Sequence, residues 1–229
     1  MFTRSKTAAP LPDLIRQLQG SADVRSRLFP VPDGVAEVLP DAGLRRGCSY
    51  ALEAPGALLL GLLAEPSRDG AWCGVVGIPE LGAEAAHEAG VAIDRLVLVP
   101  DPGRRWLSVV AALAEVLGVI AVRPSGSVSP ADANRLASRL RDREATMLVV
   151  GPWPRVEATL RVEASLWSGV GTGYGHLEGR EATLSVTSKR YPVPRRTRLL
   201  LPGPDGRVAA LARQTPAEIP TGRHLQAVS

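Results

Sequence analysis

Five short, almost wholly apolar segments alternate with helical segments between about residues 33 and 151, and this alternation limits the possible folds most strongly. The apolar segments lie at 48–53, 72–76, 96–99, 119–122 and 146–150. The expected helices cover 34–39, 57–64, 80–89, 104–117 and 130–143. Short strands that are apolar on both faces are typical of a parallel sheet covered by helices on both sides. We therefore expect an α/β fold with a mostly parallel sheet flanked by helices.

The pattern changes after Pro152 and divides the rest of the chain. Residues 158–167, 175–187 and 195–201 alternate apolar and polar positions, with Gly-rich turns between them. This alternation predicts antiparallel strands added at one edge of the sheet. We expect three parts: an N-terminal helix and linker at 1–30, a core at 31–202, and a flexible C-terminal tail at 203–229.

The N-terminal part carries a short apolar stripe at helical spacing. The stripe consists of Leu11, Leu14, Ile15 and Leu18. A helix of this length is too short to be stable alone, so the stripe needs a surface to cover it. That surface is its own core, a second copy of the chain or a partner, which makes these residues a candidate self-association or partner helix.

Length and composition exclude several classes of protein. A chain of 229 residues can bury one sizeable core. No apolar run reaches the ~20 residues of a membrane span, and no continuous apolar signal sequence begins the chain, so we expect a cytoplasmic protein. The two cysteines, Cys48 and Cys73, lie far apart without the spacing of a metal or redox site. The net charge of +4 is modest, and the dominance of Arg over Lys is typical of a GC-rich genome.

The segment from Arg45 to Ala64 has the order of a phosphate-binding unit: a strand, a Gly-bearing turn, then a helix. A working P-loop reads G-x-x-x-x-G-K-S/T, where the Lys neutralises phosphate charge and the hydroxyl holds Mg²⁺. Here Gly56 is followed by Ala57 and Leu58, whose methyl and isobutyl groups bind neither phosphate nor metal. This segment therefore favours a non-catalytic scaffold without a cofactor.

Three stretches together resemble the core of the RecA recombinase. The first is G-L-R-R-G at 43–47, continued by E-A-P-G-A-L-L-L at 53–60. The second, A-H-E-A-G-V-A-I-D-R-L-V-L-V-P-D at 86–101, is the most specific. The third is G-V-I-A-V-R at 118–123, which sits like the Walker B strand. The similarity covers about residues 30–190 and implies a RecA-like, P-loop NTPase-type fold.

The positions that carry chemistry in recombinases are changed here. Ala57 and Leu58 stand where Lys and Ser/Thr would be, and Arg123 stands where the Walker B Asp would end its strand. Glu80 lies within one residue of the place of the catalytic Glu, but it has no Mg²⁺–triphosphate to act on. The resemblance therefore implies a RecA-like domain without catalytic residues.

Among RecA-like proteins the chain most resembles the ImuA-prime family, the accessory factors of the actinobacterial translesion-synthesis mutasome. The resemblance implies an adaptor in SOS-induced mutagenesis that binds an inactive Y-family polymerase homologue. A replicative-type error-prone polymerase is a second implied partner, and the nucleoid is the implied place of action after DNA damage. We expect the Y-family homologue to bind mainly beyond about residue 190.

Two other functions stay open at this stage. One is a regulator that binds recombinase filaments or acts like a cell-division inhibitor of the SOS response. The other is a weak DNA-dependent ATPase with an unusual site. Nucleotide binding separates the ATPase from both non-catalytic functions, and co-purification with the polymerase homologue or with recombinase filaments separates the remaining two.

A basic segment, Ser188 to Arg198, is the strongest charge feature of the chain. Its candidate contact residues are Lys189, Arg190, Tyr191, Arg195, Arg196 and Arg198. Such a segment can bind a phosphate backbone, with the Tyr ring stacked on a base. An acidic protein partner, or a solvated turn without a specific role, fits the same pattern.

Smaller features give expectations that a structure can check. We expect Trp72 and Trp167 in the core, because they lie at strand positions, and Trp153 partly exposed between two prolines. Ser129 followed by Pro130 predicts the N-cap and first position of the helix at 130–143.

Overall fold

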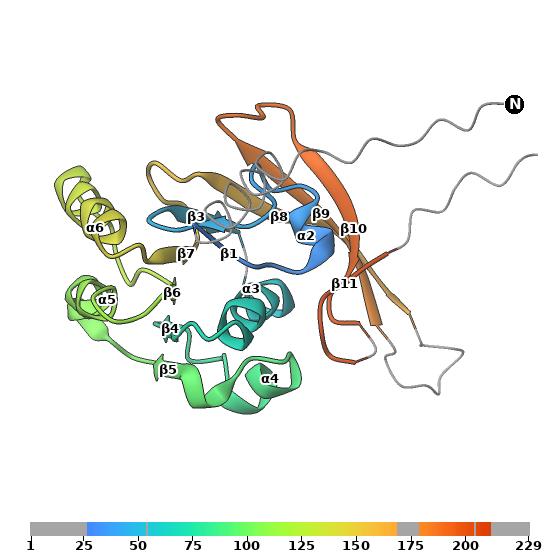
Figure 1. Cartoon of the computed structure of the whole chain (residues 1–229), viewed down its shortest axis with the longest axis horizontal. Helices are drawn as coiled ribbons and strands as arrows, with labels where there is room; N and C mark the ends of the chain where they lie inside the picture. The colour runs from blue at the N-terminus through green and yellow to red at the C-terminus, as the bar shows by residue number, and fades with distance from the viewer. Residues whose placement is uncertain (1–26, 54, 169–178, 204, 212–229) are drawn as a thin grey trace, which may run out of the picture.

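The computed structural model describes residues 27–53, 55–168, 179–203 and 205–211, which form a large mixed sheet. The sheet has the order β11-β10-β9-β8-β3-β7-β6-β4-β5 (Figure 1). Its strands are β3 (Ser49–Leu52), β4 (Cys73–Val76), β5 (Leu96–Val99), β6 (Val119–Val122), β7 (Thr146–Val150), β8 (Ala158–Ser168), β9 (Gly179–Ser188), β10 (Arg195–Leu200) and β11 (Ala209–Ala210). Every pairing from β8 to β5 is parallel, and the pairings from β8 to β11 are antiparallel.

Helices cover both faces of the parallel strands. Figure 1 shows α2 (Asp33–Ala36), α3 (Ala57–Arg68) and α4 (Ala83–Glu88) on one face, and α5 (Trp106–Leu113) and α6 (Pro130–Asp142) on the other. Short 3-10 turns, η1 (Ile93–Arg95) and η2 (Gly103–Arg105), precede β5 and α5, while β1 (Leu28–Phe29) pairs with β2 (Leu44–Arg45). In the described part of the chain, no helix is both long and apolar enough to cross a membrane.

Successive residues of one strand pack in two different cores, because their side chains point to opposite faces of the sheet. Val75 packs in the core with α3, whereas Val76 packs in the core with α5 and α6. Leu148 and Val149 of β7 divide in the same way. The expected α/β fold, with a mostly parallel sheet flanked by helices and antiparallel strands near the C-terminus, is confirmed.

The first of the three C-terminal segments pairs differently from our expectation. β8 is antiparallel to β9 but lies parallel to β3, with Tyr50 opposite Ala158. Residues 151–157 carry the chain back across the sheet, and the Glu157 amide donates to the Ser49 carbonyl at 2.8 Å as β8 begins. Alternation of apolar and polar residues along a strand indicates which face is covered, but it does not indicate the direction of the neighbouring strand. The expectation that β8 is antiparallel to both of its neighbours was therefore wrong, because β8 is parallel to β3.

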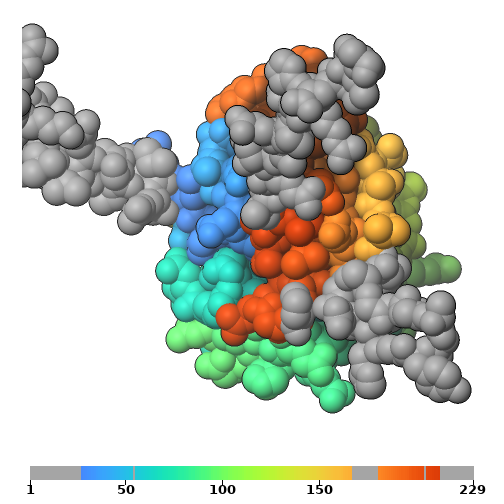
Figure 2. All heavy atoms as spheres, turned by 90° about the vertical axis from the view of Figure 1, so that its right-hand side faces the viewer, coloured from blue at the N-terminus to red at the C-terminus, as the bar shows by residue number. Residues whose placement is uncertain are grey.

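The C-terminal strands pack over α2 and α3. A Cβ on Gly34 would lie 2.3 Å from Leu199 Cδ2, and one on Gly61 would lie 2.3 Å from Val208 Cγ2. Figure 2 shows the residues around β11, in red, lying beside the blue and teal segments that include these helices. The tail that we expected to begin at residue 203 therefore contributes β11 to the sheet. The candidate helix with Leu11, Leu14, Ile15 and Leu18 lies outside the described residues.

Two of the three tryptophan expectations were wrong. Trp72 is 46% exposed, because it precedes β4 at the amino edge of the sheet, where little packs above it. Trp153 is only 9% exposed, and its ring meets Trp106 edge-on at 6.2 Å between centroids. The side chain of Trp167 lies outside the described residues.

The helix start at Ser129 is confirmed. The Ser129 hydroxyl accepts a hydrogen bond from the Asp132 amide at 3.1 Å, and Pro130 is the first residue of α6. Pro at this position loses no hydrogen bond, because the first helical amide has no partner within the helix.

We predict that Gly61→Ala destabilises the protein by up to about 2 kcal/mol in chemical denaturation. Alanine favours the helix by about 1 kcal/mol, but the clash with Val208 costs about 1–3 kcal/mol. In a Val208→Ala background the clash is absent, so Gly61→Ala should be neutral or stabilising there. Gly126→Ala, which enters open space, is the control. Equal effects of Gly61→Ala in both backgrounds would contradict the proposed packing.

Candidate functional site

The carboxyl edge of the parallel strands brings together the positions expected to hold a nucleotide. β3, β4 and β6 run in the same direction, so the turn at Gly56 and the residues Gly77 and Arg123 follow them at one edge. β7 lies between β3 and β6. Open α/β sheets bind ligands outside the carboxyl ends of their strands, which makes this edge the first place to look for a site.

In the described part of the segment between β3 and α3 there is no basic side chain, and the exposed Glu53 pairs with Arg161. Gly56 has φ 113° and ψ −150°, a conformation open essentially to glycine alone. Ala57 is half-buried, and Leu58 is 5% exposed and packs in the core with α3. The Leu58 side chain is thus not available to a ligand.

An ion pair joins the ends of β4 and β6. The Arg123 guanidinium donates to both carboxylate oxygens of Glu80, with Nη1 2.9 Å from Oε2. The hydrogen bonds from Arg123 hold the pKa of the Glu80 carboxyl below its usual value, and Glu80 raises the pKa of Arg123. Gly77 permits this approach, because a Cβ there would lie 2.6 Å from the Arg123 carbonyl oxygen. The two residues thus satisfy each other at the edge.

Metal and thiol chemistry find little support in the described part of the chain. It contains no group of three or more His, Cys, Asp or Glu side chains that could hold a metal ion. Burial raises the pKa of the Cys73 thiol to about 12, and burial also raises the pKa of the half-buried Cys48 thiol. Neither thiol is therefore activated as a nucleophile.

Three residues of the basic segment are bound to other parts of the chain. Arg196 forms a bidentate pair with Glu163 at 2.8 and 3.1 Å, and Arg198 donates to Glu181 at 2.6 Å. Arg195 donates to the Glu37 carbonyl at 2.7 Å and lies over the Tyr191 ring, 5.0 Å from its centroid. Carboxylates thus offset the charges of Arg196 and Arg198.

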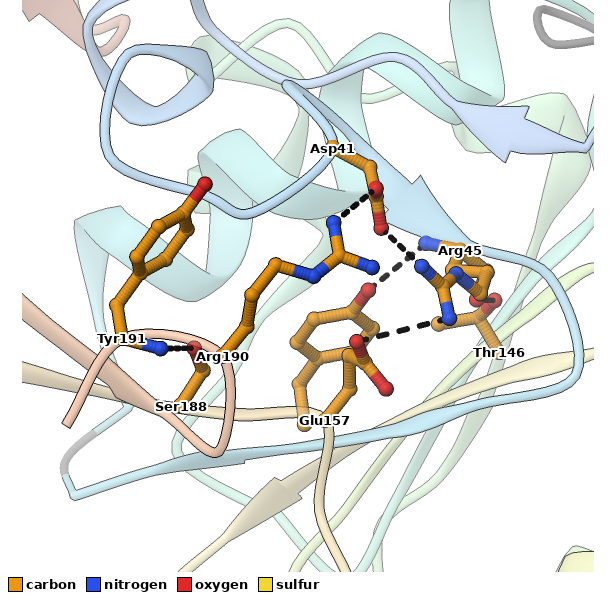
Figure 3. A network of polar contacts seen from close by, with 8 residues as sticks. Asp41, Arg45, Thr146, Glu157, Ser188, Arg190 and Tyr191 are labelled. Carbon is orange, nitrogen blue, oxygen red and sulfur yellow. Dashed lines mark hydrogen bonds and ion pairs between the residues drawn. The ribbon is translucent and has the colours of Figure 1, made fainter.

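Arg190 belongs to a polar network that sequence analysis did not anticipate (Figure 3). Asp41 accepts from Arg190 at 2.9 Å and from Arg45 at 2.6 Å. Arg45 also lies 3.7 Å from Glu157, and its carbonyl accepts from the Thr146 hydroxyl at 2.9 Å. Partial burial raises the pKa of the Asp41 carboxyl, but the two guanidinium groups outweigh it and hold that pKa below its usual value. The network fixes the turn after β9 against the segment before β3.

Sequence reasoning also missed two arginines near this network. A recess is lined by Arg141 of α6, by Arg155 of the segment between β7 and β8, and by Lys189 and Arg190. These residues are distant in sequence and belong to no motif. An arginine-rich composition hides such a cluster, because arginines also occur at many unrelated surface positions.

We predict that Asp41→Asn lowers the free energy of unfolding by about 1 kcal/mol near pH 7, where the charged carboxylate accepts from both arginines. A carboxyl group with a depressed folded-state pKa stabilises above its unfolded pKa and loses that contribution as the pH falls through the folded pKa. The difference from wild type should therefore shrink as the pH falls below about 4.

The measurement is denaturant unfolding across this pH range. Asp94→Asn is the control, because Asp94 is exposed and forms no side-chain ion pair within the described residues. A difference between wild type and Asp41→Asn that stays constant with pH would show that the carboxylate charge is not the cause.

Comparison with known proteins places this chain in a family. Residues 37–155 match a family model described as the MT3502 N-terminal domain. The chain is also 31% identical over 132 residues to the uncharacterized protein Rv3395c of Mycobacterium tuberculosis. That match covers 57% of this chain and 62% of the relative, so the chain spans less than two thirds of the relative's length. Because the family model covers just over half of the chain, the chain belongs to the MT3502 N-terminal domain family.

Proposed function

We propose that the protein is a non-catalytic RecA-like adaptor of the ImuA-prime type, which helps to assemble polymerases during SOS-induced translesion synthesis. Its principal partner is an inactive Y-family polymerase homologue, and a replicative-type error-prone polymerase is a second partner. Its place of action is the nucleoid after DNA damage. We assign no catalytic residue and no cofactor.

The buried Leu58 side chain is the observation that carries the proposal. A nucleotide-hydrolysing turn needs a Lys and a Mg²⁺-binding hydroxyl directed at the phosphates. Here Leu58 is 5% exposed and packs in the core with α3, so its side chain is not available to a ligand. Restoring hydrolysis would need repacking of the core as well as new chemistry.

The Arg123–Glu80 pair supports the same proposal. A guanidinium at the end of β6 repels a divalent cation at the place where a carboxylate would attract one. Glu80 already accepts both hydrogen bonds from Arg123, so it is not free to orient a water molecule. Both charged groups that could serve hydrolysis are thus used in a structural contact.

The family membership agrees with the proposal. The matched range, 37–155, includes the turn at Gly56, Glu80 and Arg123. The mycobacterial source of the relative agrees with the actinobacterial distribution that the ImuA-prime resemblance implies. The part beyond about residue 190, which we expect to contact the polymerase homologue, lies outside the matched range.

We predict that Mg-ATP does not raise the melting temperature. A ligand at about 100 times its dissociation constant stabilises by about 2.7 kcal/mol, so even weak binding is detectable by thermal shift. If a shift occurs, Ala57→Glu tests its location, because a carboxylate at this half-buried position repels a triphosphate. Gly56 is unsuitable for this test, since its φ of 113° demands glycine. A shift abolished by Ala57→Glu would overturn the non-catalytic proposal.

We predict that removal of residues 212–229 weakens capture of the polymerase homologue, whereas removal of residues 1–26 chiefly reduces self-association. These boundaries keep β11 and the contact between Val208 and α3, which a cut at residue 203 would remove. The measurements are pull-down and sedimentation velocity, after circular dichroism has established that each variant is folded. If the shorter C-terminus retains full capture and the shorter N-terminus loses it, the two ends have the opposite roles.

A further inference from the structure

A recess lies between α6 and the amino end of β3, and we call it the α6 recess. Its volume is about 420 Å³, within the range of about 300–1,000 Å³ that is usual for ligand pockets. Its walls come from four segments that are distant in sequence: residues 47–49, α6, the crossover before β8 and the turn after β9. The lining includes Cys48, Ser138, Arg141, Arg155, Lys189 and Arg190.

The charges around the α6 recess do not balance. Asp41 and Glu157 face Arg190 and Arg45, so these four charges offset one another (Figure 3). Three further cations line the recess: Arg141, Arg155 and Lys189. Within the described residues, none of these three lies in an ion pair, and Arg141 donates only to the Ser138 hydroxyl, at 2.9 Å. The recess therefore presents an excess of positive charge and hydrogen-bond donors.

The backbone at Arg155 adopts a left-handed conformation, as the backbone at Ala42 and Glu144 also does. Its φ of 59° is the left-handed region, which glycine adopts without cost and which costs other residues about 1 kcal/mol or more. The conformation turns the chain beside the recess just before β8. Glycine would suit this turn better, so the stability of the turn does not account for an arginine there.

Polar groups dominate the lining, which distinguishes between two kinds of anionic partner. An acidic peptide usually binds through apolar anchors seated in pockets, with charges at the rim. Here the apolar side chains of the lining are the small Cys48 and Ala137 and the half-buried Val156. Arginine, lysine, serine and asparagine side chains are instead the groups that contact phosphate and sugar. The lining thus favours a sugar–phosphate backbone.

We propose that the α6 recess binds the phosphate backbone of single-stranded nucleic acid. A flexible strand can enter a recess that is walled by four segments, whereas the phosphates of a rigid duplex would meet only its rim. The site differs from β10, where the chain's own carboxylates engage Arg196 and Arg198. The proposal goes beyond the adaptor role, because it holds whether or not the polymerase homologue is the partner.

Binding is tested with the whole protein and a labelled oligodeoxythymidine of about 20 nucleotides, measured by anisotropy over a range of salt. Each phosphate contact contributes about −0.7 to the log–log salt slope, so three cations account for about −2. Arg155→Gly and Lys189→Ala should each weaken binding about threefold to tenfold and make the slope shallower by about 0.7. Arg155→Gly should leave the melting temperature unchanged or raised, because it relieves the backbone, so unfolding would not explain its loss of binding.

The double variant Arg196→Ala/Arg198→Ala is the matched control for the test variant Arg155→Gly/Lys189→Ala. Both remove the same charge, but only the second should weaken binding strongly and reduce the log–log salt slope from about −2 to about −0.7. The cysteines add a second readout: Cys48 lines the recess and is half-buried, while Cys73 is fully buried. The oligonucleotide should slow alkylation of Cys48 by N-ethylmaleimide.

Three results would overturn the proposal. The first is that Arg155→Gly/Lys189→Ala binds the oligonucleotide like the wild-type protein, while Arg196→Ala/Arg198→Ala loses binding. The second is alkylation of Cys48 at an unchanged rate in saturating oligonucleotide. The third is that polyglutamate competes as well as the single-stranded oligonucleotide itself, or that a duplex of the same length binds more tightly than the single strand. No assay here contains a polymerase, so failure of this proposal and failure of the adaptor role are distinguishable.

Discussion

The burial of α3 between two parts of the same sheet is the constraint on which the rest of the structure depends. The parallel strands pack against one side of this helix, and the strands after β8 bring Leu199, Leu201 and Val208 to the same core. Leu59, Leu62 and Leu63 are fully buried as a result. A helix buried on nearly all sides must be apolar all round. The leucine-rich segment after Gly56 satisfies this need.

This packing explains how structural and chemical changes at the carboxyl edge fit together. Leu58 serves the core, so the turn at Gly56 holds α3 in place and offers no side chain to a phosphate. Across the edge, Arg123 and Glu80 satisfy each other and fix the ends of β6 and β4. Both features stabilise this edge of the sheet, and both agree with the proposed non-catalytic role.

Charge on this surface is organised by pairing. Arg198 meets Glu181 on the neighbouring strand β9, and Arg196 reaches across β9 to Glu163 on β8. Cross-strand charge pairs of this kind stabilise a sheet. Arg190 and Arg45 share Asp41, which ties the turn after β9 to the segment before β3. Arg141, Arg155 and Lys189, which form no ion pair within the described residues, line the α6 recess together. A basic sequence run is therefore a poor guide to where positive charge remains available.

The sequence alone determined the alternation of strands and helices, the burial of both faces of the parallel sheet and the start of α6 at Ser129. Periodicity and capping are local properties of the chain. The absence of P-loop chemistry at Ala57 and Leu58 is likewise a property of the sequence itself. Only the tertiary structure decided that β8 runs parallel to β3, that Trp153 packs on Trp106, and that Arg196 and Arg198 are paired. It likewise brought Arg141, Arg155 and Lys189 to one recess. Strand direction and charge pairing depend on residues far apart in the chain, and no local pattern records which of them meet.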